Sequence, residues 1–208
     1  MDGLTEPDGR TGVRTGEAGE QTPELLERIR RGDPAAFETV AREHAPRLFR
    51  LAVRLTGRRE DAEDLVQETL VRALPKLRGF EGRARLSTYL IRALSNLWKN
   101  RLRSRKRSRI VEWFRRPGGD DDERDSVLDP PDRAPSPLDR LEAADRAAEV
   151  RQAVEQLEPV RRLTLLLREV EEMSYEEIAE TTGVPVGTVR SRLARARGDL
   201  RRRLGDEP

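Results

Sequence analysis

Arginine side chains gather near the carboxyl end of the 208-residue chain with a spacing that suits nucleic-acid binding. Residues 190–203 contain seven Arg and one acid, Asp199. A guanidinium group binds phosphates and guanine edges through paired hydrogen bonds. The segment is therefore predicted to bind duplex DNA. If it is helical, it would present Thr188, Arg190, Ser191, Arg192, Arg195 and Arg197.

The residues around this segment have the spacing of a helix-turn-helix from Tyr175 to Ala194. A small side chain at Ala179 would let two helices approach closely, and Gly183 could adopt the left-handed turn conformation. Because Val184 rather than Ser or Thr precedes Pro185, the second helix should lack a side-chain N-cap. The alternative is an ordinary helical hairpin with a solvated Arg face. Apolar residues available to fill the space between the helices are Ile178, Val184, Val189 and Leu193.

A second basic segment combines cations with aromatic rings. Residues 83–116 hold 12 Lys or Arg and one acid, Glu112. Aromatic rings stack on unpaired bases while cations hold the backbone, so the segment could bind single-stranded nucleic acid. We expect Trp98 to be a core residue, and the role of Tyr89, stacking or packing, stays open. The basic side chains accompanying Phe80, Tyr89 and Trp98 are Arg83, Arg85, Arg92, Lys99, Arg101 and Arg103.

An acidic segment precedes the second basic one. Five acids and no basic residue fall within 60–68. These carboxylates have no accompanying His or metal-ligand pattern, so we assign them no catalytic role. Because they repel one another, a basic protein partner would stabilise them. The single His, His44, lies on an apolar stripe and is predicted to be packed in the core.

The composition excludes several function classes. The chain has no Cys and one His, which excludes disulfides, thiolate metal sites and a Cys nucleophile. It has no glycine-rich phosphate loop, and we expect no metal, no cofactor and no enzyme activity. No apolar run approaches the ~20 residues that cross a bilayer, and residues 1–21 lack the apolar core of a secretory signal. We therefore expect a soluble, cytoplasmic protein without membrane insertion.

These segments must be positioned by helices. Aromatic residues make up 4% of the chain and charged residues 38%, which disfavours a β-sandwich or barrel. Only three of the 41 basic residues are Lys, and the rest are Arg. This excess of Arg suits phosphate binding, but it would also follow from a GC-rich genome. Residues 120–133 hold seven acids and two Arg, and five prolines fall within 108–137. The prediction is all-α: two small helical domains joined by a flexible acidic linker, the second domain being the helix-turn-helix.

Start and stop signals place the helices. Asp33-Pro34 marks a helix start and Gly57 an end, while Pro46 should kink or split the helix between them. Ser87 or Thr88 could cap the basic helix, which should run to about residue 107. The predicted helices span 23–31, 34–56, 60–74, 88–107, 138–157, 160–170, 175–182 and 185–204.

In this order, the segments resemble the extracytoplasmic-function group of bacterial RNA polymerase sigma factors. Asp61-Ala-Glu-Asp-Leu-Val-Gln-Glu68 looks like the helix of that family that binds core polymerase. Phe80-Glu-Gly-Arg-Ala-Arg-Leu-Ser-Thr-Tyr-Leu90 and Arg92-Ala-Leu-Ser-Asn96 resemble the part that melts and reads the minus-ten promoter box. Residues 185–197 are similar to the minus-thirty-five recognition helix. Two positions depart from the family pattern: Tyr89, where Trp is usual, and Asn100, where Asp is frequent.

The resemblance implies a domain organisation and a set of sites. The domains would be a disordered tail (1–21), region 2 (22–107), an acidic linker (108–137), region 4 (138–204) and a short tail (205–208). Core polymerase would contact Asp61, Asp64, Leu65, Gln67 and Glu68. Minus-ten DNA would contact Phe80, Arg83, Arg85, Thr88, Tyr89, Arg92, Asn96 and Lys99. Minus-thirty-five DNA would contact Thr188, Arg190, Ser191, Arg192 and Arg195 of the helix-turn-helix from Tyr175 to Ala194.

The resemblance also implies partners. These are core RNA polymerase (a coiled-coil of its largest subunit and the flap of the second-largest), promoter DNA and an anti-sigma factor. In the holoenzyme the chain would associate with the nucleoid. The linker would either thread a cationic polymerase channel or act as a solvated tether. The competing interpretations are a stand-alone helix-turn-helix regulator, a general binder of RNA or single-stranded DNA, and, least favoured, an enzyme.

Overall fold

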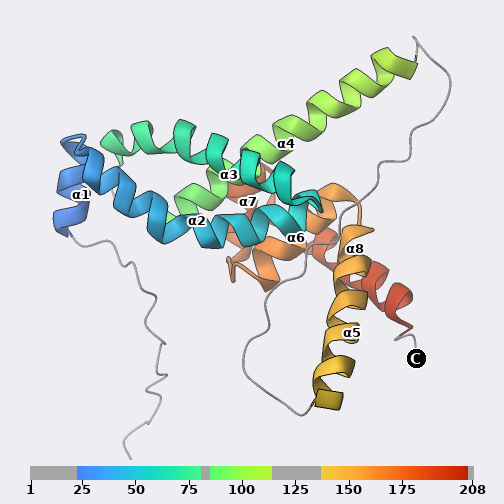
Figure 1. Ribbon diagram of the computed structural model, residues 1–208. Helices are drawn as coiled ribbons and strands as arrows, with labels where there is room; N and C mark the ends of the chain where they lie inside the picture. The colour runs from blue at the N-terminus through green and yellow to red at the C-terminus, as the bar shows by residue number, and fades with distance from the viewer. Residues whose placement is uncertain (1–22, 81–84, 114–136, 206–208) are drawn as a thin grey trace, which may run out of the picture.

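The computed structural model describes residues 23–80, 85–113 and 137–205, with side chains described outside 106–113 and 137–145. Every regular element in these ranges is helical, which confirms the predicted fold class (Figure 1). The predicted tail at 1–21, the predicted tail at 205–208 apart from Gly205, and most of the predicted linker lie outside the described residues. The elements are α1 (Pro23–Arg30), α2 (Pro34–Thr56), α3 (Arg59–Ala73), the 3-10 helix η1 (Leu74–Gly79), α4 (Leu86–Trp113), α5 (Pro137–Glu155), α6 (Pro159–Glu169), α7 (Tyr175–Thr182) and α8 (Val186–Leu204).

Local signals set the ends of α2 as predicted. The Asp33 carboxylate accepts a hydrogen bond from the Ala35 amide at 2.9 Å, and Pro34 occupies the first turn. At the other end Gly57 adopts a left-handed conformation with φ 73°, and its amide donates to the Val53 carbonyl. Both caps involve residues within a few positions of one another, so the sequence alone is sufficient to place them.

Pro46 does not split α2, contrary to one of the two expected outcomes. The helix runs from Pro34 through Pro46 to Thr56. Val40 before the proline and Leu51 after it are fully buried in the same core. Packing on both sides holds the helix together across the hydrogen bond that proline cannot donate.

The basic helix α4 differs from the prediction at both ends. It begins at Leu86, so Ser87 and Thr88 lie inside its first turn and neither is an N-cap. Leu86 is 1% exposed, and its burial fixes the helix start. At its far end the helix continues to Trp113, beyond the expected residue 107. Arg and Lys are good helix formers, and no Pro or Gly interrupts the sequence before Pro117.

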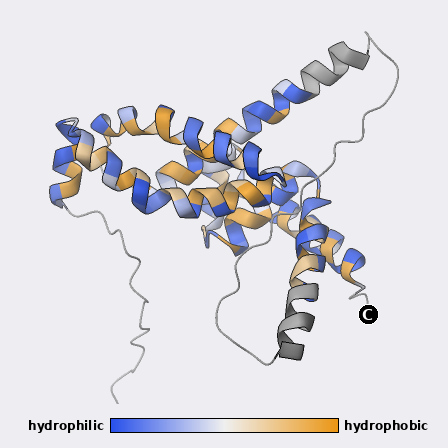
Figure 2. Ribbon diagram, in the orientation of Figure 1, coloured by the Kyte–Doolittle hydropathy of each residue, from blue (hydrophilic) through white to orange (hydrophobic). Residues whose placement is uncertain are grey.

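Helices α2, α3 and α4 pack around one apolar core. Leu51, Leu65, Leu90 and Leu94 are fully buried, and Trp98 is 5% exposed, so Trp98 is a core residue as predicted. Figure 2 shows these helices with apolar positions alternating with hydrophilic ones, which is the pattern of helices that bury a single stripe. This packing fixes the faces that α3 and α4 turn outward.

The C-terminal unit contains the predicted helix-turn-helix, α7 and α8. The Ser174 hydroxyl accepts from the Glu177 amide while the Glu177 carboxylate accepts from the Ser174 amide, a capping box that starts α7. Gly183 ends α7 with φ 72°, as expected. Helix α8 has no side-chain cap at Pro185, also as expected. Residues that pack the two helices together are Ile178, Val189 and Leu193, each 1% exposed or less.

The two units are not apart, although separate lobes were expected. Helix α6 packs on α2, and α7 packs on α4, so buried residues of both units form one continuous apolar cluster. The Arg-rich ridge of α8 is nevertheless accessible, with Arg190 and Arg195 exposed. Sequence periodicity reports that each helix has an apolar stripe, but not which distant helix covers it. None of the described helices is long and apolar enough to cross a membrane.

Candidate polymerase and nucleic-acid interfaces

Helix α3 presents its acidic side chains on the face next to α4 and on its open face. Asp64 and Gln67 are exposed, whereas Leu65 is fully buried. Leu65 was predicted to contact core polymerase, and its burial makes that assignment wrong for direct contact: it anchors α3 in the core instead. Helical periodicity explains the difference, because Leu65 belongs to the same stripe as Ala62 and Thr69.

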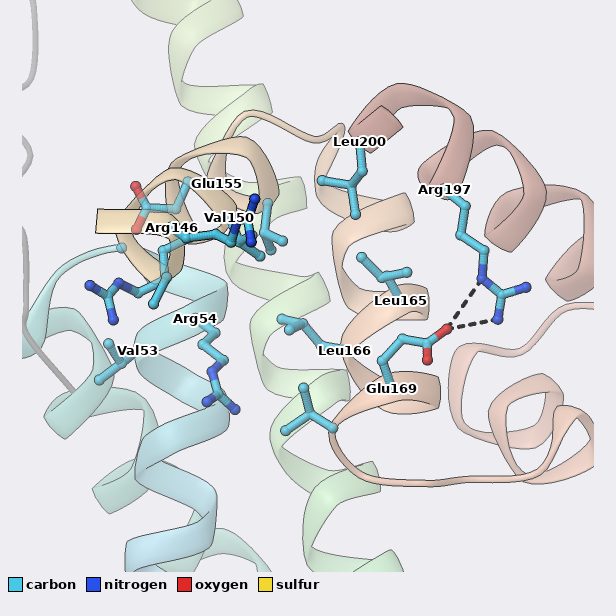
Figure 3. A pocket seen from close by; sticks show the side chains of 15 residues that line it. Val53, Arg54, Arg146, Val150, Glu155, Leu165, Leu166, Glu169, Arg197 and Leu200 are labelled. Atoms are coloured by element: carbon cyan, nitrogen blue, oxygen red, sulfur yellow. Dashed lines mark hydrogen bonds and ion pairs between the residues drawn. The ribbon is translucent and has the colours of Figure 1, made fainter. Parts of the chain in front are cut away.

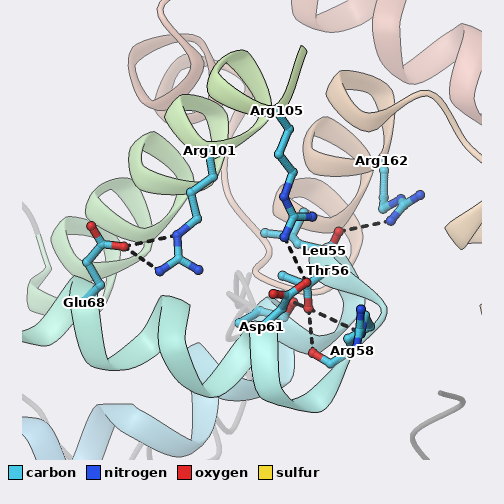
Figure 4. Close-up of polar contacts among 9 residues, drawn as sticks. Leu55, Thr56, Arg58, Asp61, Glu68, Arg101, Arg105 and Arg162 are labelled. Carbon is cyan, nitrogen blue, oxygen red and sulfur yellow. Dashed lines mark hydrogen bonds and ion pairs between the residues drawn. The ribbon is translucent and has the colours of Figure 1, made fainter. Parts of the chain in front are cut away.

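The acids of α3 have basic neighbours within the chain itself (Figure 4). The Arg101 guanidinium donates to Glu68 at 2.5 and 3.1 Å, and Arg105 donates to Asp61 at 3.1 Å. Arg72 makes a further ion pair with Glu68 at 2.6 Å. Arg72, Arg101 and Arg105 therefore already relieve part of the repulsion on α3, which was expected to be relieved by a basic partner. Sequence reasoning missed the pairs with α4 because 33 to 44 residues separate their members.

The aromatic residues before and within α4 pack on one another. The rings of Phe80 and Tyr89 lie 5.6 Å apart at 59°, and the Tyr89 hydroxyl donates to the Ala73 carbonyl at 3.3 Å. Burial raises the pKa of Tyr89. Both rings remain half-buried, so Tyr89 packs while keeping part of its surface accessible.

The other residues predicted to contact minus-ten DNA differ in accessibility. Arg85 and Asn96 are exposed, whereas Thr88 is 8% exposed and supports the start of α4 from inside. Thr88 is therefore not available as a direct DNA contact in this arrangement, because its side chain belongs to the buried stripe of the helix. Arg83 lies outside the described residues.

Arg92 and Lys99 of α4 contact α7 of the helix-turn-helix. Arg92 makes an ion pair with Glu180 at 2.6 Å. The Lys99 ammonium donates to the carbonyls of Thr181 and Thr182 at 3.0 and 3.2 Å, at the negative end of the α7 dipole. Burial, followed by the nearby charges of Arg103 and Arg192, lowers the pKa of Lys99. Lys99 and Arg192 were predicted to contact different DNA elements, and the structure brings them together.

Helix α8 carries the predicted duplex-binding residues along its exposed side. Arg190, Ser191 and Arg195 are exposed, while Thr188 and Arg192 are half-buried. The Arg190 guanidinium lies 5.9 Å from the ring centre of Tyr175. The Ser191 hydroxyl donates to the Thr188 carbonyl at 3.0 Å.

The predicted end of the helix-turn-helix, Ala194, falls inside a helix. Ala194 is exposed in the middle of α8, which continues without a break to Leu204. Its methyl side chain neither donates nor accepts a hydrogen bond, so Ala194 offers no polar DNA contact of the kind that Arg190 and Arg195 offer. The motif thus ends within the last helix, and that helix ends at Leu204 as predicted, where Gly205 caps it in a left-handed conformation.

The Arg197 side chain contacts α6 of the protein itself. It forms an ion pair with Glu169 of α6 at 2.7 Å, and the hydrogen bonds to that carboxylate raise its pKa. It therefore braces α8 on α6 rather than standing free on the recognition face. The sequence contains both residues, but not their proximity, because the turn and α7 separate them.

A groove that sequence reasoning did not predict lies where α2, α5, α6 and α8 meet (Figure 3). Its volume is about 710 Å³. Val150 and Val170 at its edge are 40% and 38% exposed. Among the residues with described side chains, no group of three or more His, Asp or Glu is placed to hold a metal ion. Lining residues labelled in Figure 3 include Val53, Leu165, Leu166, Leu200, Arg54 and Glu155.

Comparison with protein families gives two matches. Residues 40–108, from α2 to α4, match Sigma-70 region 2. Residues 147–200, from α5 to α8, match Sigma-70 region 4. The matched ranges contain the acidic helix, the basic helix and the helix-turn-helix described above.

Individual relatives cover nearly the whole chain. The RNA polymerase sigma-H factor of Pseudomonas aeruginosa is 36% identical over 185 residues, which are 86% of this chain and 91% of the relative. The ECF RNA polymerase sigma factor SigE of Mycolicibacterium smegmatis is 35% identical over 82% of this chain and 63% of its own length. Among solved structures, the sigma factor RpoE of Bartonella quintana, in complex with the anti-sigma factor NepR, superimposes with a TM-score of 0.61. It has 26% identity and covers 78% of this chain and 92% of that one.

Proposed function

The chain belongs to the extracytoplasmic-function group of sigma-70 RNA polymerase sigma factors, and from this premise we propose a division of labour between its two helical units. As a sigma factor, it serves promoter-specific initiation of transcription and has no catalytic activity of its own. The proposed division assigns residues 22–107 to region 2 and 138–204 to region 4. The observation that carries it is the placement of an acidic face and a basic face on one unit and an Arg ridge on the other.

Core polymerase binds the open face of α3 in this proposal. Asp64 and Gln67 form the centre of the contact, since both are exposed. Asp61 and Glu68 flank it and reach a partner after exchanging their ion pairs with Arg105 and Arg101. A coiled-coil of the largest polymerase subunit with basic side chains would complement this face, and the flap of the second-largest subunit would bind region 4.

Promoter DNA binds both units. Phe80, Arg85, Tyr89 and Asn96 contact the separated non-template strand at the minus-ten box, where stacking and cationic contacts offset the cost of extruding a base. Arg92 and Lys99 join this contact, and Arg83 is retained in it on sequence grounds. At the minus-thirty-five box, Arg190 and Arg195 read or clamp the duplex, with Thr188, Ser191 and Arg192 beside them.

An anti-sigma factor is proposed as a regulator of this chain. One of the similar solved structures, the sigma factor RpoE at 26% identity, is a complex with an anti-sigma factor, NepR. The site of action is the bacterial cytoplasm, at the nucleoid once the holoenzyme forms.

Reconstitution with core RNA polymerase tests the proposed function. The full chain should let core polymerase start transcripts, in a genome-wide run-off assay, at promoters that core alone ignores. The controls are core alone and core with the Asp64→Arg variant. If the chain produced no new start site, and instead bound a duplex tightly and specifically without polymerase, the stand-alone regulator would replace this proposal.

A further inference from the structure

One aromatic ring of the helix-turn-helix lies where three helices meet. Tyr175, the first residue of α7, is half-buried. The Arg168 guanidinium of α6 lies 5.3 Å from the centre of its ring, and the Arg190 guanidinium of α8 lies 5.9 Å from it. Both distances fall within the about 6 Å over which a cation is attracted to an aromatic ring. Tyr175 therefore contacts the helix before α7 and the helix after it.

Contacts on the side of α6 hold this ring in place. Arg168 also donates to the Met173 carbonyl at 2.8 Å, which ties its side chain to the loop before α7. The next residue, Ser174, starts α7 through its capping box with Glu177. The backbone on which Tyr175 begins the helix is thus fixed from both directions, and the ring is a rigid support for its neighbours.

Arg190 differs from other cations of α8 in what holds it. Arg197 pairs with the Glu169 carboxylate at 2.7 Å. No carboxylate among the residues with described side chains pairs with Arg190, which contacts the Tyr175 ring instead. A carboxylate would neutralise the guanidinium and occupy its N–H donors, but a ring does neither. Arg190 is therefore held in place and still available to an anion.

The planar guanidinium group offers different surfaces to a ring and to DNA. Its face lies on aromatic rings, while its N–H donors lie in the plane and point outward. Those donors form the paired hydrogen bonds by which Arg binds a phosphate or the edge of guanine. Contact with Tyr175 leaves these donors accessible and restricts the rotamers of Arg190. Because less conformational entropy is lost on binding, an ordered side chain binds more tightly than a free one.

We propose that Tyr175 is a positioning residue of the minus-thirty-five site, whose ring orders the Arg190 guanidinium before DNA binds. Tyr175 acts through Arg190, and Arg168 supports the ring from the side of α6. The inference rests on the proposed function, because it assigns the ordered guanidinium to promoter DNA. The gain in affinity should correspond to one exposed contact between a cation and a ring, about two- to fivefold in the dissociation constant.

Binding of the holoenzyme to a promoter duplex tests this role. The promoter is one found in the run-off assay, and fluorescence anisotropy measures its affinity for the full chain assembled with core polymerase. Tyr175→Leu removes the ring but keeps an apolar side chain, and it should weaken binding about two- to fivefold. Tyr175→Phe keeps the ring and should bind like the wild type.

Double-mutant cycles show whether Tyr175 acts through Arg190. In an Arg190→Ala background, Tyr175→Leu should cause no further loss of affinity. The matched control is an Arg195→Ala background, because Arg195 is an exposed cation of the same helix. There, Tyr175→Leu should cause the same loss as in the wild type. An equal loss in both backgrounds, or an equal loss from Tyr175→Phe and Tyr175→Leu, would overturn the proposal.

A measurement on the free wild-type chain decides the matter if Tyr175→Leu does not fold. NMR relaxation of the Nε–H groups should give a higher order parameter for Arg190, which contacts the ring, than for Arg195. Equal order parameters would reject the positioning role and leave the sigma assignment intact. A holoenzyme that binds no promoter, with Arg190 ordered in the free chain, would reject the proposed function and the role in DNA binding, but not the contact between Tyr175 and Arg190.

Discussion

Asp199 links α8 to α6 and is the clearest acid-sensitive group of the C-terminal unit. Its carboxylate pairs with Arg161 at 2.7 Å and with Arg202 at 2.5 Å, and its side chain is 15% exposed. The hydrogen bond from Arg161, followed by that from Arg202, lowers the pKa of Asp199. A depressed pKa means that the folded state holds the proton less tightly than the unfolded state.

We predict that Asp199→Asn destabilises the C-terminal unit by up to about 1 kcal/mol at pH 7. The stabilisation by Asp199 is complete above its unfolded pKa of about 3.9 and is lost as the pH falls through the lower folded pKa. The difference in thermal midpoint between variant and wild type should therefore vanish in strong acid. A constant difference from pH 7 down to about pH 2 would contradict this account.

Arg190 is the most accessible test of base reading on α8. We predict that Arg190→Ala weakens holoenzyme binding to minus-thirty-five DNA by about 1–3 kcal/mol if the guanidinium contacts a base. Arg201→Ala, which removes an exposed Arg from the last turn of the same helix, is the control. Equal losses in both variants, measured by fluorescence anisotropy, would indicate a general phosphate contact instead.

At the scale of elements, α3 has an acidic face that its own ion pairs leave partly open, and we propose that core polymerase binds there. Asp64 is exposed, so replacing it changes the surface without removing a core contact. We predict that Asp64→Arg reduces the affinity for core polymerase about tenfold or more, because it places like charges opposite one another. The control is Glu38→Arg on α2, which makes the same change of charge at another exposed position. This control should bind core polymerase normally. Affinity would be measured by pull-down titration, and normal binding by Asp64→Arg would remove α3 from the interface.

The turn of the helix-turn-helix depends on one backbone conformation. Gly183 has φ +72°, and a Cβ there would meet nothing within 4 Å, so only backbone strain opposes a side chain. We predict that Gly183→Ala lowers the free energy of unfolding by about 1 kcal/mol. Gly198→Ala, inside α8 and equally unobstructed, should instead raise it by up to about 1 kcal/mol. Urea denaturation measures the free energy of unfolding of both variants. A change of the same sign in the two variants would refute this explanation.

Elements were predictable where their signals are local. Asp33, Gly57 and Gly183 each act on neighbours within a few positions, and all three ends follow from the sequence. The local signals at Pro46 and Ser87 left the outcome to packing: α2 continues through Pro46, and α4 begins at Leu86, before the expected cap. Packing thus decides helix boundaries where it conflicts with local preference.

The candidate site depends on contacts that the sequence does not reveal. The pairs Arg101–Glu68 and Arg92–Glu180 join residues 33 and 88 positions apart. Composition placed Glu68, Arg92 and Arg101 in acidic or basic segments, and the family resemblance assigned partners to these segments. Only the fold shows that the segments first neutralise one another.

At the scale of the whole molecule, the contact between the two units couples their stability. Glu171 lies in the C-terminal unit, but its partner Arg47 belongs to α2. Arg47→Met keeps much of the length of the side chain and removes its charge, leaving Glu171 buried without that donor. A change in the N-terminal unit should therefore loosen the loop before α7.

We predict that Arg47→Met increases hydrogen exchange at the amides of residues 170–182 about tenfold in the free chain, since an unpaired buried carboxylate costs about 1–3 kcal/mol. Arg42→Met, at an exposed position on the same helix, should leave that exchange unchanged. Unchanged exchange in Arg47→Met without polymerase would mean that the two units do not meet in solution.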